Sequence, residues 1–285
     1  MLTGYFTGVS GIYYNEQKLG VTANNLANSD TTGFRKALML FRTREENEYT
    51  RMVDRDVQER NPKTYGIQRT GVYKAFNKTG SLKHTDNPMD LGIVPELKNA
   101  FFQVKKADPS DQRVFYSRDG RLSLGPMDPN NPEGPTALYT AGHLLLGDGG
   151  QPIQIDPSNG TLRISPDGVI YQNEEVTGEI PLYRFNKSPD PTRQEAANLQ
   201  MLHQLGNSIL QVPPEHNEEF NIRRLEVGKG GITRLMAQGS QEASNVNVMS
   251  EMAEMMHTTK AAEANQRALR RQVETLNRLV QLVKG

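Results

Sequence analysis

Residues 250–284 read SEMAEMMHTTKAAEANQRALRRQVETLNRLVQLVK, and this stretch decides how the ends of the chain fold. Two rows of residues, each repeating at every seventh position, run through it without a Pro or a Gly. Heptads sustained over this length are typical of a coiled-coil helix, which would be ~50 Å long at ~1.5 Å per residue. The first row is Met252, Thr259, Gln266, Val273 and Val280, and the second is Met255, Ala262, Leu269, Leu276 and Val283.

The N-terminal stretch predicts a second amphipathic helix. Its apolar residues recur three and four apart, which places them on one stripe that Glu16 interrupts: Leu2, Tyr5, Val9, Ile12, Leu19, Ala23 and Leu26. We expect this helix to end near Gly33 and residues 34–60 to be a mixture of helix and loop. A helix gains most of its stability by packing its apolar face, so the two ends are expected to pack on each other. The N-terminal helix is shorter, so further copies of the chain are expected to cover the remainder.

The middle of the chain differs in composition from both ends. All 16 Pro lie between Pro62 and Pro214, and short apolar or alternating runs there predict strands separated by tight turns. The expected strands are 101–104, 114–116, 144–146, 153–155, 161–164, 169–171, 182–185 and 220–222. Turns are expected at Asp119-Gly120, 147–150, Asn159-Gly160 and Asp167-Gly168, a loop at 126–135, and a loop or short helix at 187–200.

These patterns predict an α+β fold with two domains. The long N- and C-terminal helices are expected to form a coiled-coil domain from residues 1–60 and 240–285, together with its connecting segment. Residues 61–239 are expected to form a β-rich middle domain. A length of 285 residues agrees with this division, because a domain has ~150 residues on average.

Composition excludes several classes of protein. Lys and Arg number 33 and so do Asp and Glu, so net charge gives no reason to expect nucleic acid or stable membrane association. Cys is absent, which excludes disulfides, Cys zinc sites and a Cys nucleophile. No apolar run approaches the ~18 residues of a membrane span. The N-terminus lacks a basic segment followed by an uninterrupted apolar one, so no cleaved signal peptide is expected.

No motif points to catalysis, to a cofactor or to a metal. The five His do not follow metal-ligand spacing; they are His84, His143, His203, His216 and His257. Residues 228–231, GKGG, lack the spacing of a phosphate-binding loop, and Asp128 and Asp148 sit in ordinary turn sequences. The basic last helix and its Met cluster are interpreted as a solvated face and as packing. The sequence therefore predicts a protein that is not an enzyme.

Three segments carry a family resemblance. Residues 23–35, ANNLANSDTTGFR, closely resemble the ANNLAN-x-x-T-x-GF-[KR] signature of the bacterial flagellar rod and hook proteins. Residues 238–246 are similar to that family's C-terminal G-x-x-E-x-SNV signature. In the middle, 87–91, 101–104 and 116–120 resemble its PLD, GFFxV and YTRDG segments. The chain is short for a hook protein, which favours a rod protein, and residues 4–11 and the divergent middle favour a proximal over a distal rod member.

The resemblance implies an architecture and a function. In this family the terminal helices pack as an inner coiled-coil layer beneath a β-rich outer domain. Subunits stack helically into the rod, the axial shaft that transmits torque across the periplasm. The implied partners are copies of the chain, other rod and hook proteins, and the flagellar type III export apparatus, which exports such proteins without signal-peptide cleavage. The implied location is the periplasmic rod of the flagellar basal body.

The residues expected to take part in assembly lie at the two ends. Asn24, Asn25 and Asn28 either hydrogen-bond across subunits or cap the helix locally, and Arg35 either pairs with a neighbour's carboxylate or is solvated. The full set is Leu2, Tyr5, Val9, Ile12, Leu19, Asn24, Asn25, Leu26, Asn28, Phe34, Arg35, Ser244, Asn245, Val246, Met252, Met255, Leu269, Val273, Leu276 and Val280.

Two other classes of protein fit parts of the pattern. A trimeric fibrous adhesin or phage-tail-like component would also combine a helical stalk with a β-rich head. A glycan-processing enzyme with a coiled-coil anchor would need paired carboxylates in a cleft. Asp119, Asp148 and Asp167, its candidates, all stand in turn sequences instead.

Overall fold

The computed structural model describes residues 2–45, 64–76, 78–108, 110–129, 131–186, 199–206, 208–215, 220–228 and 231–284. The chain forms two compact units, each described here by itself. The helical unit comprises Met1–Ala27, Ala37–Lys74 and Asn247–Gly285, and the β unit comprises Asn28–Lys36 and Ala75–Val246. The chain therefore passes from one unit to the other four times.

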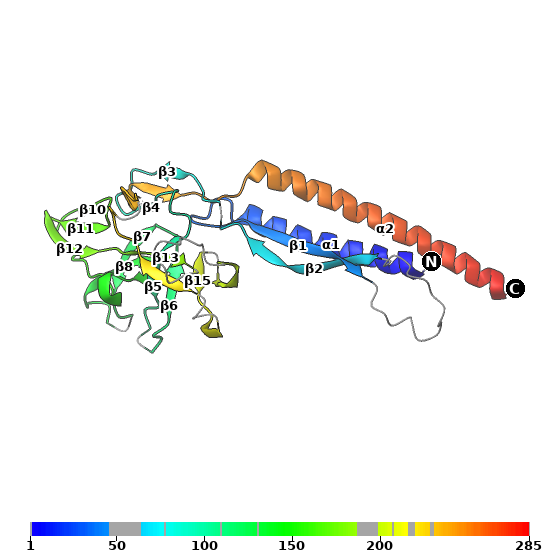
Figure 1. Cartoon of the computed structure of the whole chain (residues 1–285), viewed down its shortest axis with the longest axis horizontal. Coiled ribbons are helices and arrows are strands. Elements are labelled where there is room, and N and C mark those ends of the chain that lie inside the picture. Colours follow the sequence, from blue (N-terminus) through cyan, green and yellow to red (C-terminus); the bar gives the residue numbers. More distant parts are fainter. Residues whose placement is uncertain are drawn as a thin grey trace. The chain divides into compact units, whose positions relative to one another are not determined.

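The helical unit pairs the two ends of the chain, as the sequence predicts. Helix α1 (Leu2–Ala27) lies antiparallel to α2 (Val248–Lys284), and Figure 1 shows them side by side. Strands β1 (Ala37–Glu45) and β2 (Thr64–Lys74) form an antiparallel hairpin that packs on α1. The ring of Tyr14 meets that of Phe41 edge to face, and the Ile67 amide donates a hydrogen bond to the Ser10 hydroxyl.

Helix α1 ends at Ala27, earlier than the predicted end near Gly33. The Asn28 carbonyl accepts a hydrogen bond from the Thr31 amide, which starts a turn in place of another helical turn. Gly33 stands beyond that turn with a φ of 66°, a backbone conformation that glycine adopts without strain. The expectation of helix and loop for residues 34–60 is wrong for 37–45, which form strand β1 because they pair with β2; residues 46–60 lie outside the described residues.

The β unit is built from antiparallel sheets. Among the described residues, its largest sheet has nine strands, in the order β14-β15-β6-β5-β9-β8-β7, with β13 pairing with both β5 and β16. The elements are β3 (Leu82–His84), β4 (Leu91–Ile93), β5 (Ala100–Lys105), β6 (Val114–Ser117), β7 (Leu122–Pro126), β8 (Thr136–Thr140), β9 (His143–Leu145), η2 (Asp148–Gly150), β10 (Leu162–Ile164), β11 (Val169–Gln172), β12 (Glu175–Glu179), β13 (Leu182–Asn186), η3 (Leu199–Met201), β14 (His203–Leu205), β15 (Ile209–Gln211), β16 (Asn221–Arg224), β17 (Met236–Gln238) and β18 (Ser240–Glu242).

Strand β5 divides the core of the β unit in two. Successive side chains of a strand point to opposite faces, so Phe102 packs into one buried cluster and Phe101 into another. The first cluster is mainly aliphatic, with Leu91, Leu145 and Ile170 among its fully buried members. The second is aromatic, and Phe101 meets Phe185 edge to face with ring centroids 5.4 Å apart.

Two sequence expectations for the middle are wrong in detail. Residues 153–155 form no strand; Gln154 makes a single bridge to Ala137, beside a Pro152 that lacks an amide hydrogen. Asp119-Gly120 is not a hairpin turn, because β6 and β7 on either side pair with different strands. Asp167-Gly168 does turn the chain between the paired strands β10 and β11, as predicted. Of residues 187–200, predicted as a loop or short helix, 187–198 lie outside the described residues, and 199–200 belong to the short helix η3.

Candidate assembly site

On the α1 side, the contact with α2 is made by small and polar residues. A Cβ atom added to Gly8 would lie 3.2 Å from Leu269 Cδ1, and one added to Gly11 would lie 2.9 Å from Asn265 Nδ2. Lys18 forms an ion pair with Glu254 in the same contact. The two glycines therefore let the helices approach closely. The buried polar residues of the two helices are Asn15, Thr22, Asn25, Glu251 and Thr258.

Asn25 connects three elements of the helical unit. Its Oδ1 accepts a hydrogen bond from the Ala37 amide at 2.8 Å, while its Nδ2 donates to the Ala37 carbonyl at 2.8 Å and to Glu251 Oε2 at 3.0 Å. The side chain is 1% exposed. The structure thus places Asn25 in contacts within its own chain, between α1, β1 and α2. Asn28 is buried as well and accepts a hydrogen bond from the Thr31 hydroxyl, whereas Asn24 is exposed.

The apolar stripe predicted on α1 does not form the contact with α2. Tyr5, Ile12, Leu19 and Leu26 are half-buried, Val9 is 40% exposed, and the side chain of Leu2 lies outside the described residues. At about 100° per residue, this stripe lies roughly a quarter turn from the line of Gly8, Gly11 and Lys18. The helices meet at the glycines because backbones approach most closely where no Cβ intervenes. The stripe is therefore partly covered in a single chain, with Val9 left exposed.

One of the two predicted heptad rows of α2 faces α1, and the other does not. Met255, Leu269 and Leu276 are half-buried. Met252, Val273 and Val280 of the other row are 45%, 37% and 53% exposed. Helix α2 has 37 residues and α1 has 26. Because Gly8 of α1 already lies against Leu269, the last turns of α2 extend beyond the start of α1.

A buried charge cluster lies in the β unit, and we call Arg35, Arg118 and Glu242 the Glu242 cluster. Arg118 Nε donates to Glu242 Oε2 at 2.7 Å, and Arg35 Nη2 lies 2.8 Å from Glu242 Oε1. All three side chains are 5% exposed or less. The Gly80 amide also donates to Glu242 Oε1, and the Gly33 amide donates to the Glu242 carbonyl. One carboxylate thus holds segments that are about 200 residues apart in sequence.

The surroundings of the Glu242 cluster leave no room for extra atoms. A Cβ on Gly80 would lie 1.7 Å from the Ala243 carbonyl oxygen, and one on Gly120 would lie 1.6 Å from that of Leu91. Next to the cluster, the Thr32 hydroxyl donates to Asp119 Oδ1 at 2.5 Å. Asp119 also pairs with Arg121 at 2.9 Å. These contacts explain why Asp119-Gly120 does not act as a hairpin turn.

The C-terminal signature is held beside the N-terminal one. Asn245 Oδ1 accepts a hydrogen bond from the Lys36 amide at 2.6 Å, and its Nδ2 donates to the carbonyls of Ala75 and Lys78. The Asn245 amide donates to the carbonyl of Phe34, whose side chain is fully buried. Ser244 and Val246 are half-buried, and the Ser244 hydroxyl accepts a hydrogen bond from the Val246 amide. Most of both signature segments therefore lies together in the β unit.

Two of the three carboxylates considered for a glycan-processing enzyme, Asp119 and Asp148, each pair with an arginine. Asp119 is bound to Thr32 and Arg121, and Asp148 pairs with Arg224. Within the described part of the chain, no three His, Cys, Asp or Glu side chains gather as metal ligands. No described helix is long and apolar enough to cross a membrane.

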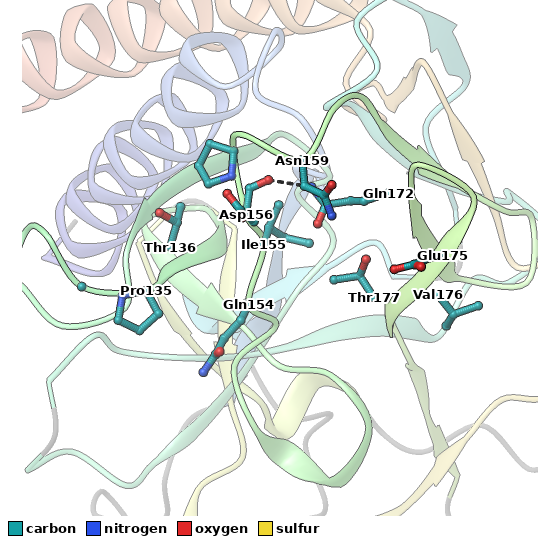
Figure 2. A pocket seen from close by; sticks show the side chains of 12 residues that line it. Pro135, Thr136, Gln154, Ile155, Asp156, Asn159, Gln172, Glu175, Val176 and Thr177 are labelled. Atoms are coloured by element: carbon teal, nitrogen blue, oxygen red, sulfur yellow. Dashed lines mark hydrogen bonds between the residues drawn. The ribbon is translucent and has the colours of Figure 1, made fainter.

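A pocket of about 520 Å³ opens in the β unit away from these residues. Figure 2 shows Gln172, Asp156 and Asn159 on one side of it and Glu175, Val176 and Thr177 on another. Gln172 Nε2 donates to the backbone carbonyl of Asp156, and the Asp156 carboxylate accepts a hydrogen bond from the amide of Ser158. These two polar groups of the pocket thus hold local turns of the β unit.

Together these features define a class: a structural protein whose two ends pair into a helical unit that carries uncovered apolar rows. Comparison with known proteins agrees with this class. Residues 7–35 match the family model described as flagella basal body rod protein, and residues 237–282 match the one described as flagellar basal body rod FlgEFG protein C-terminal.

Relatives match nearly the whole chain. The flagellar basal-body rod protein FlgF of Mesorhizobium japonicum is 31% identical over 90% of this chain and 87% of its own length. FlgG of Buchnera aphidicola from Schizaphis graminum is 25% identical over 99% of this chain and 100% of its own. FlhO of Bacillus subtilis, a flagellar hook-basal body complex protein, is 25% identical over 94% of both. The chain belongs to the flagellar basal-body rod protein family. It is a structural component of the rod and not an enzyme.

Sequence reasoning missed several residues of these sites. Gly8 and Gly11 were not expected to face α2, and Arg118 and Glu242 stand inside the quoted motifs without a role assigned to them. For Arg118 and Glu242 the sequence gives a partial indication, because a charged residue that is buried needs a partner of opposite charge or hydrogen bonds. Which partner it finds depends on contacts between distant segments, which spacing alone does not give.

Proposed function

We propose that this protein self-assembles helically, with copies of itself and with other rod and hook proteins, into the axial shaft that transmits torque. The observation that carries the proposal is the uncovered apolar row of α2, with Val273 and Val280 exposed in a helix whose other row is occupied by α1. The half-covered stripe of α1 supports it. Apolar rows on long helices gain stability when further helices cover them, and a repeated contact of this kind builds an open filament.

We further propose that the protein is a proximal rod subunit. FlgF relatives match at 31%, 28% and 26% identity over most of this chain. FlgG relatives match at 25% to 28%, so the two groups differ little. The slightly higher match to FlgF agrees with the divergent middle segment. Locating the subunit along purified basal bodies with an antibody tests the assignment, and a position at the hook-proximal end would contradict it.

The proposed route to the rod is export through the flagellar type III apparatus without cleavage of a signal peptide. Support comes from membership of the flagellar basal-body rod protein family. The location that follows is the periplasmic part of the basal body. Mass spectrometry of the N-terminus of rod-bound protein tests this directly. An N-terminus that starts inside α1 would contradict it.

The assembly proposal is tested by placing a charge on the open row. Val273→Asp and Val280→Asp change exposed side chains, so the free chain is expected to keep the helix content of the wild type by circular dichroism. Covering an unpaired charge is strongly unfavourable, so rods and motility are expected to be lost. Gln281→Asp, a change at an exposed polar residue on the next position of α2, is the matched control and is expected to assemble. Normal rods with Val280→Asp would contradict the proposal.

A further inference from the structure

The chain passes four times between the helical unit and the β unit, and side-chain amides hold the backbone beside several of these crossings. The crossings fall after Ala27, Lys36, Lys74 and Val246. They are covalent connections, so a load on one unit reaches the other at least in part through them. Two asparagines lie within two residues of a crossing, Asn25 in the helical unit and Asn245 in the β unit.

Asn245 gathers three segments of the β unit at the points where they leave it. Its Oδ1 accepts a hydrogen bond from the Lys36 amide at 2.6 Å, and its Nδ2 donates to the carbonyls of Ala75 at 3.1 Å and Lys78 at 2.9 Å. The Ala75 amide also donates to the Lys36 carbonyl at 2.9 Å. Lys36 and Ala75 each stand at a crossing, and Asn245 stands one residue before a third.

Asn25 has the corresponding place in the helical unit. Its Oδ1 accepts from the Ala37 amide and its Nδ2 donates to the Ala37 carbonyl, both at 2.8 Å. The side chain thus pairs with Ala37 as a residue of a neighbouring strand would. Its Nδ2 also donates to Glu251 Oε2 at 3.0 Å, near the start of α2. Ala37 is the first residue after one crossing, and Glu251 lies shortly after another.

The pattern of contacts requires a primary amide. An asparagine side chain offers one oxygen as acceptor and two N–H groups as donors, whereas an ionised aspartate of the same size only accepts. The oxygens of Asn25 and Asn245 each accept one of these bonds, and the nitrogens each donate two. The successive amides of Lys36 and Ala37 are therefore held by asparagines of different units.

We propose that Asn25 and Asn245 are positioning residues that fix, each within its own unit, the backbone where the chain passes between the units. Losing either side chain then frees the crossing backbone and leaves the buried clusters of the β unit in place. The value of this arrangement rests on the proposed function, since fixed crossings matter in a subunit that transmits torque.

Asn245→Ala tests the β unit in the full-length chain, with Asn131→Ala at an exposed asparagine as the matched control. Hydrogen exchange is measured at the Lys36 amide and, as a reference, at the amide of the buried Val104 in β5. We expect Asn245→Ala to speed exchange at Lys36 about tenfold or more relative to Val104, because the released segment opens locally. Asn131→Ala should change neither rate. Equal acceleration at both amides would make Asn245 an ordinary stabilising residue, and unchanged exchange at Lys36 would show that it does not fix the crossing; either would overturn the inference.

Asn25→Ala tests the helical unit in the same way, with Asn277→Ala at an exposed position of α2 as its control. The Ala37 amide is expected to exchange about tenfold faster or more relative to the Leu19 amide within α1. The Lys36 amide is expected to stay protected. Equal acceleration at Lys36 and Ala37 would show that the crossing opens as one structure and is not fixed separately in each unit. That result, or unchanged exchange at Ala37, would contradict the inference.

Asn245→Asp separates the amide group from the size of the side chain. It keeps an oxygen for the Lys36 amide and has no hydrogen for the carbonyls of Ala75 and Lys78, so rod formation and motility are expected to fall as they do in Asn245→Ala. Rods at the wild-type level in the Asn245→Asp chain would refute the need for an amide. If the wild type itself forms no rods, the proposed function fails, while the exchange results still decide the roles of the two asparagines.

Discussion

At the scale of single residues, the absence of a side chain is as important in this protein as its presence. Gly8 and Gly11 allow α2 to approach α1, and Gly80 and Gly120 allow backbone to pass beside the Glu242 cluster. The four positions differ in what an added carbon would meet. At Gly11 it meets the end of the flexible Asn265 side chain, and at Gly120 it meets the Leu91 backbone. The Leu91 backbone cannot move aside without disturbing strand β4, so a side chain at Gly120 is expected to be much less tolerated than one at Gly11.

Replacing Gly120 with Ala is therefore expected to destabilise the β unit strongly. The added Cβ would lie 1.6 Å from the Leu91 carbonyl oxygen, and such overpacking together with lost hydrogen bonds costs about 3 kcal/mol or more. Gly178→Ala is the control, since its Cβ would meet Ile153 at an ordinary 3.4 Å. Urea denaturation of the two variants measures the difference. Equal free energies of unfolding would refute the close approach at Gly120.

At the scale of elements, the sequence predicts the helices well and the strands in part. The heptad rows of α2 and the absence of Pro from the last 71 residues indicate one long helix, and that helix spans Val248–Lys284. Strands β5, β6, β11 and β13 are apolar enough to be recognised. Strands β3 and β18 were missed because they are short, polar at most positions and fixed by pairing with each other. The local sequence pattern cannot reveal that β3 pairs with β18, because the two strands are about 160 residues apart in the chain.

The same limit explains the part of the assembly site that was mispredicted. Apolar spacing in α1 indicates a stripe that must be covered, and it gives no information on which neighbour covers it. The contact inside the chain instead uses Gly8, Gly11 and a line of polar residues, which periodicity does not distinguish from an exposed face. The signature residues Phe34 and Asn245 were expected at subunit contacts, and their described contacts are within the β unit.

The ion pair between α1 and α2 gives the helical unit a small dependence on pH. Burial alone would lower the pKa of Lys18, but its hydrogen bond to Glu254, aided by Tyr14, raises the pKa above the usual 10.5. The pair therefore stabilises the helices below pH 10.5 and is lost as the pH rises through the higher folded value. Because both side chains are partly exposed, we expect less than about 1 kcal/mol.

Chemical denaturation of the wild type and of Lys18→Met at several pH values measures this contribution. The difference in unfolding free energy between the two chains is expected to shrink above pH 10.5, and to shrink also in high salt, which screens exposed charges. The Lys18→Met chain lacks only this titrating group, so other residues that lose protons in the same range affect both chains equally. A difference that grows with pH would contradict the ion pair.

At the scale of the whole molecule, the two units differ in how they bury their apolar residues. The β unit has two buried clusters and the Glu242 cluster, so its stability comes from contacts within one chain. In the helical unit, α1 contributes small and polar residues to the helix contact and keeps a half-buried apolar stripe, while the α2 row with Val273 and Val280 is exposed. The β unit therefore buries its apolar residues within one chain, whereas the helical unit leaves apolar residues exposed. Neighbouring subunits of a filament can cover such residues.

The most direct test of the open rows is the reactivity of a single cysteine at Val280. The chain has no cysteine of its own, so Val280→Cys gives one labelling site on a side chain that is 53% exposed. A chain that still supports motility is labelled with a thiol reagent as free protein, in isolated basal bodies and after denaturation. Fast labelling of the free chain and of denatured basal bodies, with strong protection in intact ones, is the predicted result. Equally fast labelling in intact basal bodies would show that α2 is not covered in the rod.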